Sequence, residues 1–481
     1  MRVSARRRGV AVLLALSLMA VACGRQAPKA EKPGAFARAP ILLVGLDGFE
    51  WNAVLPLLRQ GELPTIAALL QHGAYGTLES FPGRVSPALW TSIATGKDVE
   101  KHGIYDFLRQ RNPAVFYSSA DRKTKAFWNI LTDRGRRVDT VGWFVTYPAE
   151  TVNGVMVAQT NTRDVQRERH TMKGALLPGV AGQVYPTERE AQVFGVMDDV
   201  ESGLDALVME RLGAPVASAP QRFRGPLAAS TWAFRADAIY ERTATLLARE
   251  TAPDVLAVYF GSTDVVGHRF WSLTKQRGFP GRFLVGPAGR KLAPYMRPGS
   301  IPNALLGSLF WRAMEPEEAE SWPRRVLLRS YEYTDAALGR LIAAMPPQTT
   351  VIVVSDHGFR PWGHQDGPDA FFLAAGTNVR PTGGPSPEKL ARSNLRRIGS
   401  ILDVTPTLLA LLGIPLGLDM DGRVLDGAFR SLSGTQRPAP IATHDTKQWL
   451  AARAGQAPPG PTTSDAEAER LEQLRALGYI Q

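Results

Sequence analysis

The feature that most constrains the fold of this chain is a set of short apolar runs separated by segments with helical spacing. Three such runs cover residues 41–46, 255–260 and 350–355. They do not alternate between apolar and polar side chains, so each is expected to be a strand buried on both faces. Residues 138–143 form a further strand candidate. Helical segments between the runs, such as residues 231–249, predict an α/β fold with a mostly parallel central sheet and helices on both faces.

The predicted main domain covers residues 41–426 and contains further helices and two irregular stretches. Residues 161–226 are mixed and polar, and residues 271–322 are rich in Pro, Gly and Arg. Neither stretch fits the strand–helix alternation, so both are predicted to be excursions that cap the edge of the sheet. Further helices are expected over residues 64–71, 325–345 and 403–413, the last closed by Gly413.

Residues 427–481 are predicted to form a C-terminal extension. Within it, residues 455–463 are rich in Pro and Gly, which is typical of a linker. A final charged helix is expected to begin at Ser464, with Glu467 completing a capping box.

The N-terminus has the organisation of an export signal. Its basic start is followed by an apolar run over residues 9–22, too short for a membrane-spanning helix, and then by Cys23. The preceding Ala-Val-Ala resembles a bacterial lipobox. We therefore expect residues 1–22 to be a signal peptide, Cys23 to be lipidated, and residues 23–40 to be a flexible tether in the bacterial cell envelope, facing the periplasm or on the outer membrane. The alternative is an ordinary secretory signal that leaves Cys23 as a free thiol.

Cysteine usage and charge exclude several classes of protein. Cys23 is the only cysteine, so a disulfide framework and a thiolate metal cluster are excluded, and any metal ligands must be His, Asp or Glu. The formal net charge of +11 is partly due to arginines at the N-terminus. The remaining basic residues are spread along the chain, so no nucleic-acid-binding surface is predicted.

Acidic and imidazole side chains follow each of the three apolar runs. The carboxyl ends of parallel strands meet at one edge of a sheet, so we expect these side chains to lie together. Two of them are four residues apart, which places them on one face if that segment is helical. Mixed carboxylates and imidazoles suit Zn²⁺ or a similar divalent ion, and six ligands are enough for two ions. Each residue alone could belong to an ordinary turn or loop; their shared placement favours a metal site. The candidates are Asp47, Asp264, His268, Asp356, His357 and His364.

A serine precedes a short predicted helix over residues 86–96. Ser86 is expected to be the N-cap, Pro87 the first helical residue and Gly96 the residue that ends the helix. A helix N-terminus also favours phosphate. From the local sequence alone, Ser86 is either a nucleophile beside the metal site or only a helix cap.

Six motifs, in this order, resemble the alkaline phosphatase superfamily, specifically its type I phosphodiesterase/nucleotide pyrophosphatase-like branch. They are LDG at residues 46–48, SPALWTSIATG at 86–96, KHGI at 101–104, STDVVGH at 262–268, SDHGF at 355–359 and DVTPTLLALLGIP at 403–415. In that superfamily the nucleophile lies nine residues before a Thr-Gly pair. Ser86 stands nine residues before Thr95-Gly96, so the resemblance selects it.

The resemblance implies a zinc-dependent phosphohydrolase, most nearly a phosphodiesterase, that acts on a small phosphoester through a phospho-Ser86 intermediate. One implied zinc ion is surrounded by Asp47, Ser86, Asp356 and His357. The other implied zinc ion is held by Asp264, His268 and His364.

Two departures from the family pattern concern the substrate. Nucleotide pyrophosphatases usually present Thr-Phe-Pro at the nucleophile, where this chain has Ser86-Pro87, so the substrate pocket need not match. The sulfatase motif, with Pro two residues and Arg four residues after the nucleophile, is absent. Two alternatives stay open: a phosphoryl or phosphoalcohol transferase with the same site, and a non-catalytic envelope lipoprotein. A monoester carries one more negative charge than a diester and requires further positive charge at the site. Arg84 is expected to point away from Ser86, so a diester is predicted to be preferred over a monoester.

Overall fold

The computed structural model describes residues 39–111, 114–159, 176, 180–271, 316–359, 367–430 and 437–454. The chain divides into two units, residues 1–32 and residues 33–481. All described residues belong to the second unit. The predicted signal peptide, Cys23, His364 and the final helix from Ser464 lie outside the described residues.

The centre of the main sheet consists of three parallel neighbours. Strand β1 (Ile41–Leu46) lies between β8 (Val255–Phe260) and β9 (Thr350–Val354), and it is parallel to both. Strand β5 (Val138–Val141) extends this parallel set on the far side of β8. The three apolar runs and the fourth candidate are therefore strands, as predicted, with ends that differ by no more than two residues.

The sheet is mixed rather than wholly parallel. Strand β10 (Ala370–Ala375) lies antiparallel between β9 and β2 (Ala74–Glu79). Among the described residues the main sheet has nine strands, in the order β11-β2-β10-β9-β1-β8-β5-β6-β7. The remaining strands are β6 (Met156–Val157), β7 (Val184–Tyr185) and β11 (Arg397–Ser400), and a separate pair is formed by β3 (Leu108–Arg111) and β4 (Ala114–Phe116).

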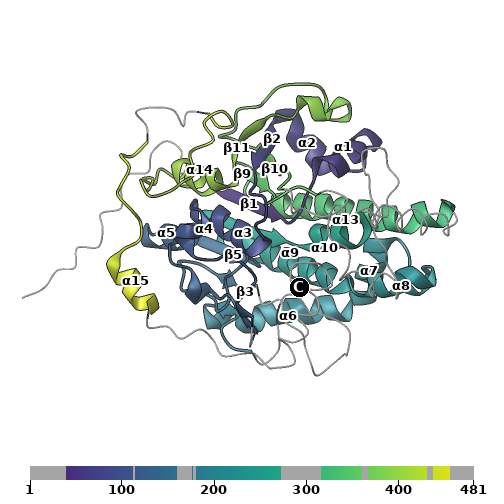
Figure 1. Cartoon of the computed structure of the whole chain (residues 1–481), viewed down its shortest axis with the longest axis horizontal. Helices are drawn as coiled ribbons and strands as arrows, with labels where there is room; N and C mark the ends of the chain where they lie inside the picture. The colour runs from purple at the N-terminus through teal and green to yellow at the C-terminus, as the bar shows by residue number, and fades with distance from the viewer. Residues whose placement is uncertain are drawn as a thin grey trace, which may run out of the picture. The chain divides into compact units, whose positions relative to one another are not determined.

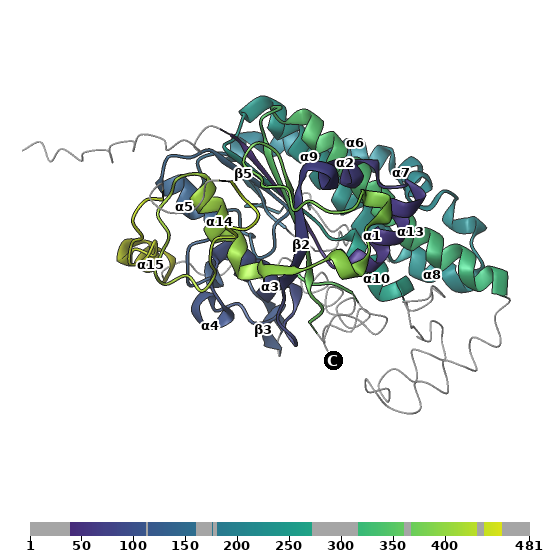
Figure 2. The ribbon, with the colours of Figure 1, turned by 90° about the horizontal axis from the view of Figure 1, so that it is seen from above.

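Helices cover both faces of this sheet, as predicted. In Figure 2, α3, α5 and α14 lie on one side of the strands, and α2, α9 and α13 lie on the other. The helices are α1 (Trp51–Gln60), α2 (Pro64–His72), α3 (Ser86–Thr95), α4 (Val99–His102), α5 (Phe127–Asp133), α6 (Glu190–Ser202), α7 (Leu204–Leu212), α8 (Gln221–Ala228), α9 (Thr231–Thr251), α10 (Ser262–Phe270), α13 (Pro316–Ala344), α14 (Val404–Leu411) and α15 (Lys447–Ala454). Short 3₁₀ turns include η6 (Pro387–Lys389), η7 (Arg392–Asn394) and η8 (Ile401–Asp403).

The core explains why the apolar runs lack alternation. Every residue of β1 and β8 is buried, so both faces of these strands pack against helices. The absence of a side chain at Gly45 lets α3 approach β1 closely, because a Cβ atom there would lie 2.6 Å from the Trp90 ring. The Trp90 ring then meets those of Trp143 and Tyr259 edge to face, at centroid distances of 5.1 and 5.2 Å. This aromatic cluster places α3 on the sheet.

The two irregular stretches differ in how much of them is described. The described part of residues 161–226 is largely helical, and it includes α6 and α7, which pack against α9 and α13 (Figure 1). Apolar side chains of α6 and α7, such as Val193 and Leu212, are buried. Most of residues 271–322 lies outside the described residues, and its end belongs to α13, which begins at Pro316, nine residues before the predicted start.

The described part of the C-terminal extension lies against the main domain. Asp445 forms an ion pair of 2.7 Å with Lys97, whose Nζ atom also lies 2.5 Å from Asp419. Lys97 is buried, and it directly follows the Gly96 that ends α3. The extension is thus joined to the helix that begins with Ser86.

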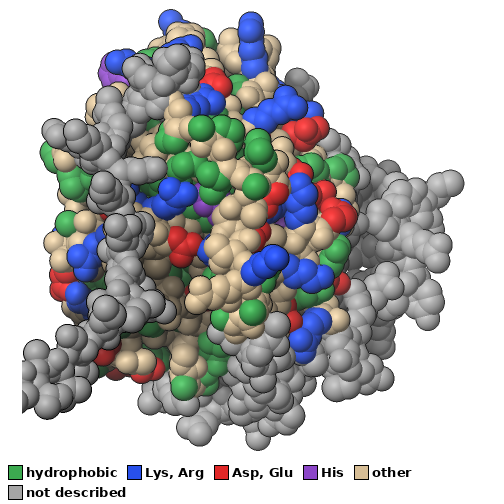
Figure 3. All heavy atoms as spheres, turned by 90° about the vertical axis from the view of Figure 1, so that its left-hand side faces the viewer, with side chains coloured by type: hydrophobic (Ala, Val, Ile, Leu, Met, Phe, Trp, Pro, Cys, Tyr) green, Lys and Arg blue, Asp and Glu red, His purple; other side chains and the backbone are tan. Residues whose placement is uncertain are grey.

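Two properties considered in the sequence can be followed in the structure: the distribution of charge on the surface, and the length and apolarity of the helices. On the face shown in Figure 3, basic and acidic side chains are interspersed. Lys101 and Asp421 form an exposed ion pair, at 2.5 Å. Within the described ranges, no helix has both the length and the apolarity to cross a membrane.

Candidate active site at the carboxyl edge of the sheet

The candidate site is built on loops that leave the parallel strands in the same direction. Asp47 follows β1 directly, and Asp356 and His357 follow β9 after one serine. Helix α10 begins two residues after the end of β8. Because β1, β8 and β9 are parallel neighbours, all of these residues arrive at one edge of the sheet.

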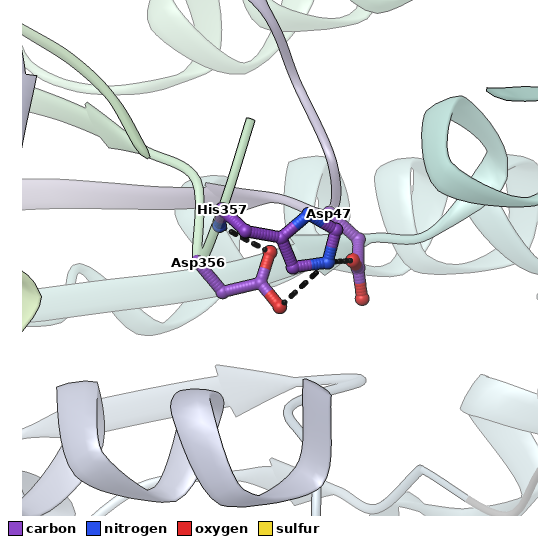
Figure 4. A group of neighbouring side chains, drawn as sticks. All are labelled: Asp47, Asp356 and His357. Carbon is purple, nitrogen blue, oxygen red and sulfur yellow. Dashed lines mark hydrogen bonds and ion pairs between the residues drawn. The ribbon is translucent and has the colours of Figure 1, made fainter. Parts of the chain in front are cut away.

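Three side chains converge on one point, as Figure 4 shows. The Nε2 atom of His357 lies 3.4 Å from Asp47 Oδ1 and 3.4 Å from Asp356 Oδ2. One possible ligand atom from each residue lies within 4.8 Å of the other two, and all three residues are buried. Their separation in sequence is about 310 residues, yet they form a group that could hold a metal ion, as predicted.

A second group lies beside the first. Helix α10 carries both Asp264 and His268, and His268 Nε2 is 3.4 Å from Asp264 Oδ1, so the predicted helical turn is confirmed. Asp264 Oδ1 also lies 3.9 Å from His357 Nε2, which connects the two groups. We call Asp47, Asp356 and His357 the strand-borne half of the site, and Asp264 and His268 the helix-borne half. The structure does not describe His364, the third predicted ligand of the helix-borne half.

The electrostatics of the strand-borne half favour a cation. Burial, together with the charge of Asp47, raises the pKa of Asp356 well above its ordinary value. Burial lowers the pKa of His357, but the charge of Asp356 and the hydrogen bond with Asp47 outweigh it and raise the pKa to about 10. Carboxylates gathered in a buried space need compensating positive charge.

The donor atoms themselves fit a divalent metal ion. Asp356 Oδ2 is buried and accepts no hydrogen bond from the described residues. His357 Nδ1 lies 2.8 Å from the carbonyl oxygen of Gly358, so in the neutral ring Nδ1 carries the proton and the Nε2 lone pair faces the carboxylates. Oxygen and nitrogen donors in this arrangement suit zinc or a similar ion.

The orientation of Asp47 depends on two aromatic residues that sequence reasoning did not identify. Tyr259 donates a hydrogen bond of 2.6 Å to Asp47 Oδ2, and Trp90 Nε1 donates one of 3.1 Å to the same oxygen. Burial and the charge of Asp47 raise the pKa of Tyr259 well above its ordinary value, so its hydroxyl stays a donor. These bonds leave Asp47 Oδ1 facing His357 and Ser86.

Glu50 is a further residue that sequence reasoning missed. Its Oε2 atom accepts a hydrogen bond of 3.0 Å from the backbone N–H of Phe359, and its Oε1 atom accepts one of 3.0 Å from Asn52 N. Glu50 is buried and also meets Arg392 Nη1 at 3.3 Å. It therefore joins the loop that carries Asp47 to the loop that carries His357. No local pattern reveals this, because the Glu50–Phe359 contact spans 309 positions.

Ser86 lies beside the strand-borne half, one position further into its helix than predicted. Helix α3 begins at Ser86 itself, and the N-cap is Val85, whose carbonyl accepts bonds from Ala88 N and Leu89 N. The predicted N-cap role of Ser86 is therefore wrong, because Val85 already has the extended backbone that an N-cap adopts. No side-chain capping bond is present at this helix, and Ser86 Oγ instead donates a 3.4 Å hydrogen bond to Asp47 Oδ1.

Two further residues close to Ser86 in sequence, Arg84 and His102, contact other side chains. Arg84 Nη2 pairs with Glu100 at 3.2 Å in an exposed position. His102 Nδ1 accepts a bond from Ile104 N, so the neutral ring carries its proton on Nε2 and donates to Ser92 Oγ at 3.0 Å. His102 is therefore a donor to Ser92 and not a base for it.

Trp143 and Tyr147 follow β5, and they have different surroundings. Trp143 is buried and donates from Nε1 to the carbonyl oxygen of Trp90, so it belongs to the core beneath α3. Tyr147 is half-buried, and its hydroxyl donates to the carbonyl oxygen of Ala181.

A mostly parallel α/β sheet with buried carboxylates, an imidazole and a serine at its carboxyl edge has the layout of a metal-dependent hydrolase. Residues 41–405 match the model of the family described as type I phosphodiesterase/nucleotide pyrophosphatase. The chain belongs to this family. The resemblance predicted from the motifs is thereby confirmed and, at the level of the family, so is the class of enzyme, a hydrolase of phosphoric esters.

Curated relatives match only a short part of the chain. One is the 2,3-bisphosphoglycerate-independent phosphoglycerate mutase of Synechococcus sp. (strain JA-2-3B'a(2-13)), which is 33% identical over 125 residues, 24% of this chain and 23% of the relative. The mutase of the same name from Synechococcus sp. (strain JA-3-3Ab) is 31% identical over 128 residues, again 24% and 23%. The chain thus spans about a quarter of the length of these relatives.

Similar solved structures include a sulfatase and two phosphonate hydrolases. A 2-O GAG sulfatase has a TM-score of 0.47 and 11% identity, over 80% of this chain and 73% of its own. A phosphonate monoester hydrolase from Silicibacter pomeroyi has a TM-score of 0.43 and 14% identity, over 81% of this chain and 76% of its own. A phosphonoacetate hydrolase from Sinorhizobium meliloti 1021 has a TM-score of 0.36 and 18% identity, over 68% of this chain and 57% of its own. At these scores the similarities do not bear on the activity of this chain.

Proposed function

We propose that this protein is a phosphodiesterase of the nucleotide pyrophosphatase type that uses two divalent metal ions, preferably zinc, and a phospho-Ser86 intermediate. The observation that carries the proposal is the 3.4 Å contact between Ser86 Oγ and Asp47 Oδ1. It puts a hydroxyl nucleophile beside the buried group of possible metal ligands formed by Asp47, Asp356 and His357. A nucleophile next to Lewis-acid ligands is the arrangement that phosphoryl displacement requires.

The proposed ligand sets follow the two halves of the site. The strand-borne half, with Ser86, would hold one ion. The helix-borne half would hold the other, with His364 as its third ligand. When bound, such ions supply Lewis acidity that lowers the pKa of a coordinated hydroxyl and stabilises charge on phosphoryl oxygens.

The residues of this chain then perform two displacements. Ser86 Oγ gives up its proton and attacks phosphorus, forming a P–O bond to Ser86 while the bond to the first alcohol breaks and that alcohol takes a proton. In the second displacement, water attacks phosphorus, the bond to Ser86 Oγ breaks, and the Ser86 hydroxyl regains a proton. The N-terminus of α3, where Ser86 stands, places the positive end of the helix dipole next to the phosphate.

The contacts of the described residues favour a diester. A monoester dianion carries one more charge than a diester, and enzymes that prefer it require further positive charge. Arg84, the nearest basic residue in sequence before Ser86, pairs with Glu100 instead.

Phosphoryl transfer is a second candidate, and the short match to the mutases supports it. A transferase would form the same phospho-Ser86 intermediate, and an acceptor alcohol would replace water in the second displacement. Comparing product ratios with and without added alcohols distinguishes hydrolysis from transfer. A product that appears only when an alcohol is added would favour the transferase.

The test of the proposed function is a comparison of wild type and Ser86→Ala with bis-p-nitrophenyl phosphate, both loaded with zinc. We expect Ser86→Ala to lower kcat by at least about 10³-fold, because the covalent step is lost. Metal content should change little. Ser92→Ala is the matched control, since Ser92 lies on the same helix but bonds to His102. Full activity in Ser86→Ala, or a phosphate trapped on Thr91, would contradict the proposal.

Export and lipid anchoring through Cys23 are also part of the proposed function, on the basis of the N-terminal pattern alone. We expect wild type to be processed and recovered with membranes, and Cys23→Ser to accumulate as an unprocessed precursor. Normal processing of Cys23→Ser to a soluble product would instead indicate an ordinary secretory signal.

A further inference from the structure

Helix α7, from the polar stretch that the motifs leave unexplained, inserts an arginine into the interior. Arg211 is fully buried, and its guanidinium lies 3.1 Å from the centroid of the Tyr333 ring on α13. Burial lowers the pKa of Arg211, and a buried cation is costly unless other groups compensate its charge. Arg211 therefore marks a place where this stretch contributes more than apolar packing.

The compensating carboxylate is Asp237, which comes from α9. Asp237 Oδ2 lies 3.9 Å from Arg211 Nη2, and Asp237 is itself buried. Its two oxygens accept hydrogen bonds from the first backbone N–H groups of the α10 segment, those of Gly261 at 2.8 Å and Ser262 at 3.2 Å. Helix α10 has no capping bond from its own N-cap residue, so Asp237 satisfies its N-terminus from another helix.

Arg211 also contacts α10 directly. Its Nη1 atom donates a hydrogen bond of 3.2 Å to Ser262 Oγ. The first turn of α10 is thus fixed by a carboxylate from α9 and a guanidinium from α7. Asp264 lies in that same turn, and His268 lies one turn further. A rotation or shift of α10 would move both side chains together relative to the strand-borne half.

We propose that the Arg211–Asp237 pair is a positioning element that fixes α10 and thereby the helix-borne half of the site. Its consequence for metal binding rests on the proposed function. The pair acts through Asp264 and His268 and does not itself contact substrate. The inserted helix α7 thereby has a role beyond packing. Through Arg211 it helps to support the helix-borne half of the site.

The experiment uses the full chain with Asp237→Asn and Arg211→Met. Asp237→Asn keeps the shape and one acceptor oxygen but removes the charge that pairs with Arg211. We expect it to weaken binding of one of the two zinc ions by roughly 10–100-fold, as loss of an outer partner of a metal ligand does, and to leave the other unchanged. At saturating zinc, kcat should return close to that of wild type. If Arg211→Met does not fold, Asp237→Asn alone decides.

Arg122→Met is the matched control, because Arg122 is also buried and pairs with a carboxylate, Glu150, at 2.8 Å. It should lower the unfolding midpoint without changing the affinity of either ion. Equal weakening in Arg122→Met, or wild-type zinc affinities in Asp237→Asn, would overturn the proposal.

Hydrogen exchange separates this inference from the proposed function. In metal-free protein, the backbone amides of α10 should exchange faster in Asp237→Asn than in wild type, while those of α3 should not change. Unchanged exchange in α10 would refute the positioning role. Wild type that binds no zinc and cleaves no phosphoester would instead refute the proposed function.

Discussion

The two halves of the candidate site are held in different ways. The strand-borne half stands at the ends of β1 and β9, where hydrogen bonds from Tyr259 and Trp90 orient Asp47. The helix-borne half stands on the single helix α10, whose position depends on Asp237 and on Arg211. The difference shows that the ends of the strands place the ligands of one half, whereas the ligands of the other half are placed by a helix whose N-terminus is held by two further helices.

Exposure follows the same division. The side chain of His357 is 1% exposed and that of Asp356 is fully buried, whereas the His268 side chain is 13% exposed. Deeper burial strengthens each electrostatic interaction and raises the cost of removing one partner. We therefore expect changes in the strand-borne half to have the larger effects.

Among changes to the two groups of ligands, the largest expected effect is that of Asp356→Asn, which tests this ranking against His268→Ala. Asp356→Asn should remove mainly the ion of the strand-borne half. It should lower kcat/KM by more than the roughly 10–100-fold typical of an outer partner, because it removes a buried ligand. His268→Ala should remove mainly the other ion, with a smaller loss. Metal analysis after dialysis and kinetics with a diester measure both. Loss of the same single ion from both variants would show that the halves form one site.

A smaller effect is expected for Glu50→Gln, which sharpens the comparison by loosening the strand-borne half without removing a ligand. Glu50 joins the two ligand loops through Phe359 N, and Gln keeps one acceptor oxygen but loses the charge that meets Arg392. We expect kcat/KM to fall roughly 10–100-fold, with both ions still bound at saturating zinc. Glu100 forms an exposed pair with Arg84, so Glu100→Gln is the control and should leave kcat/KM unchanged. An unchanged kcat/KM in Glu50→Gln would mean that strand register alone fixes these loops.

The smallest effect on activity at neutral pH is expected for His102, which bonds to Ser92 on α3 and whose titration acts on stability at low pH. Burial, aided by the charge of Arg122, lowers the pKa of His102 from 6.5 to about 3 in the folded protein. The unfolded chain therefore binds a proton more readily. This group should leave stability unaffected above about pH 6.5 and reduce it as the pH falls toward 3. Urea unfolding of metal-free protein at several pH values measures this.

In that experiment, His102→Gln should show a flatter pH dependence between pH 6.5 and 4 than wild type, because the titrating group is gone. Both proteins are compared with chelator present, so that proton competition for the metal ligands does not differ. Parallel pH profiles for the two proteins would exclude His102 as a source of acid sensitivity.

The parallel centre of the sheet, formed by β1, β5, β8 and β9, and the chemistry-bearing residues at its edge could be predicted from the sequence, whereas the other five strands of the described sheet could not. Strands such as β1 and β8 are buried on both faces, and this requirement is visible as unbroken apolar runs. Asp47, Asp356 and His357 could be brought together in advance because parallel strands that are neighbours must end at one edge. Helical spacing likewise put Asp264 and His268 on one face of α10.

The tertiary structure alone decided which groups hold those residues in place. The bond from Tyr259 to Asp47 spans 212 positions and that from Phe359 to Glu50 spans 309, so each depends on strand order and register rather than on local spacing. The position of Ser86 as the first residue of α3 depends on the backbone of Val85. Arg211 reads as one more charge on a polar segment, and only the packing of α7 against α9 and α13 buries it beneath α10. Local patterns follow from burial and periodicity, whereas partners distant in sequence exist only once the elements have packed.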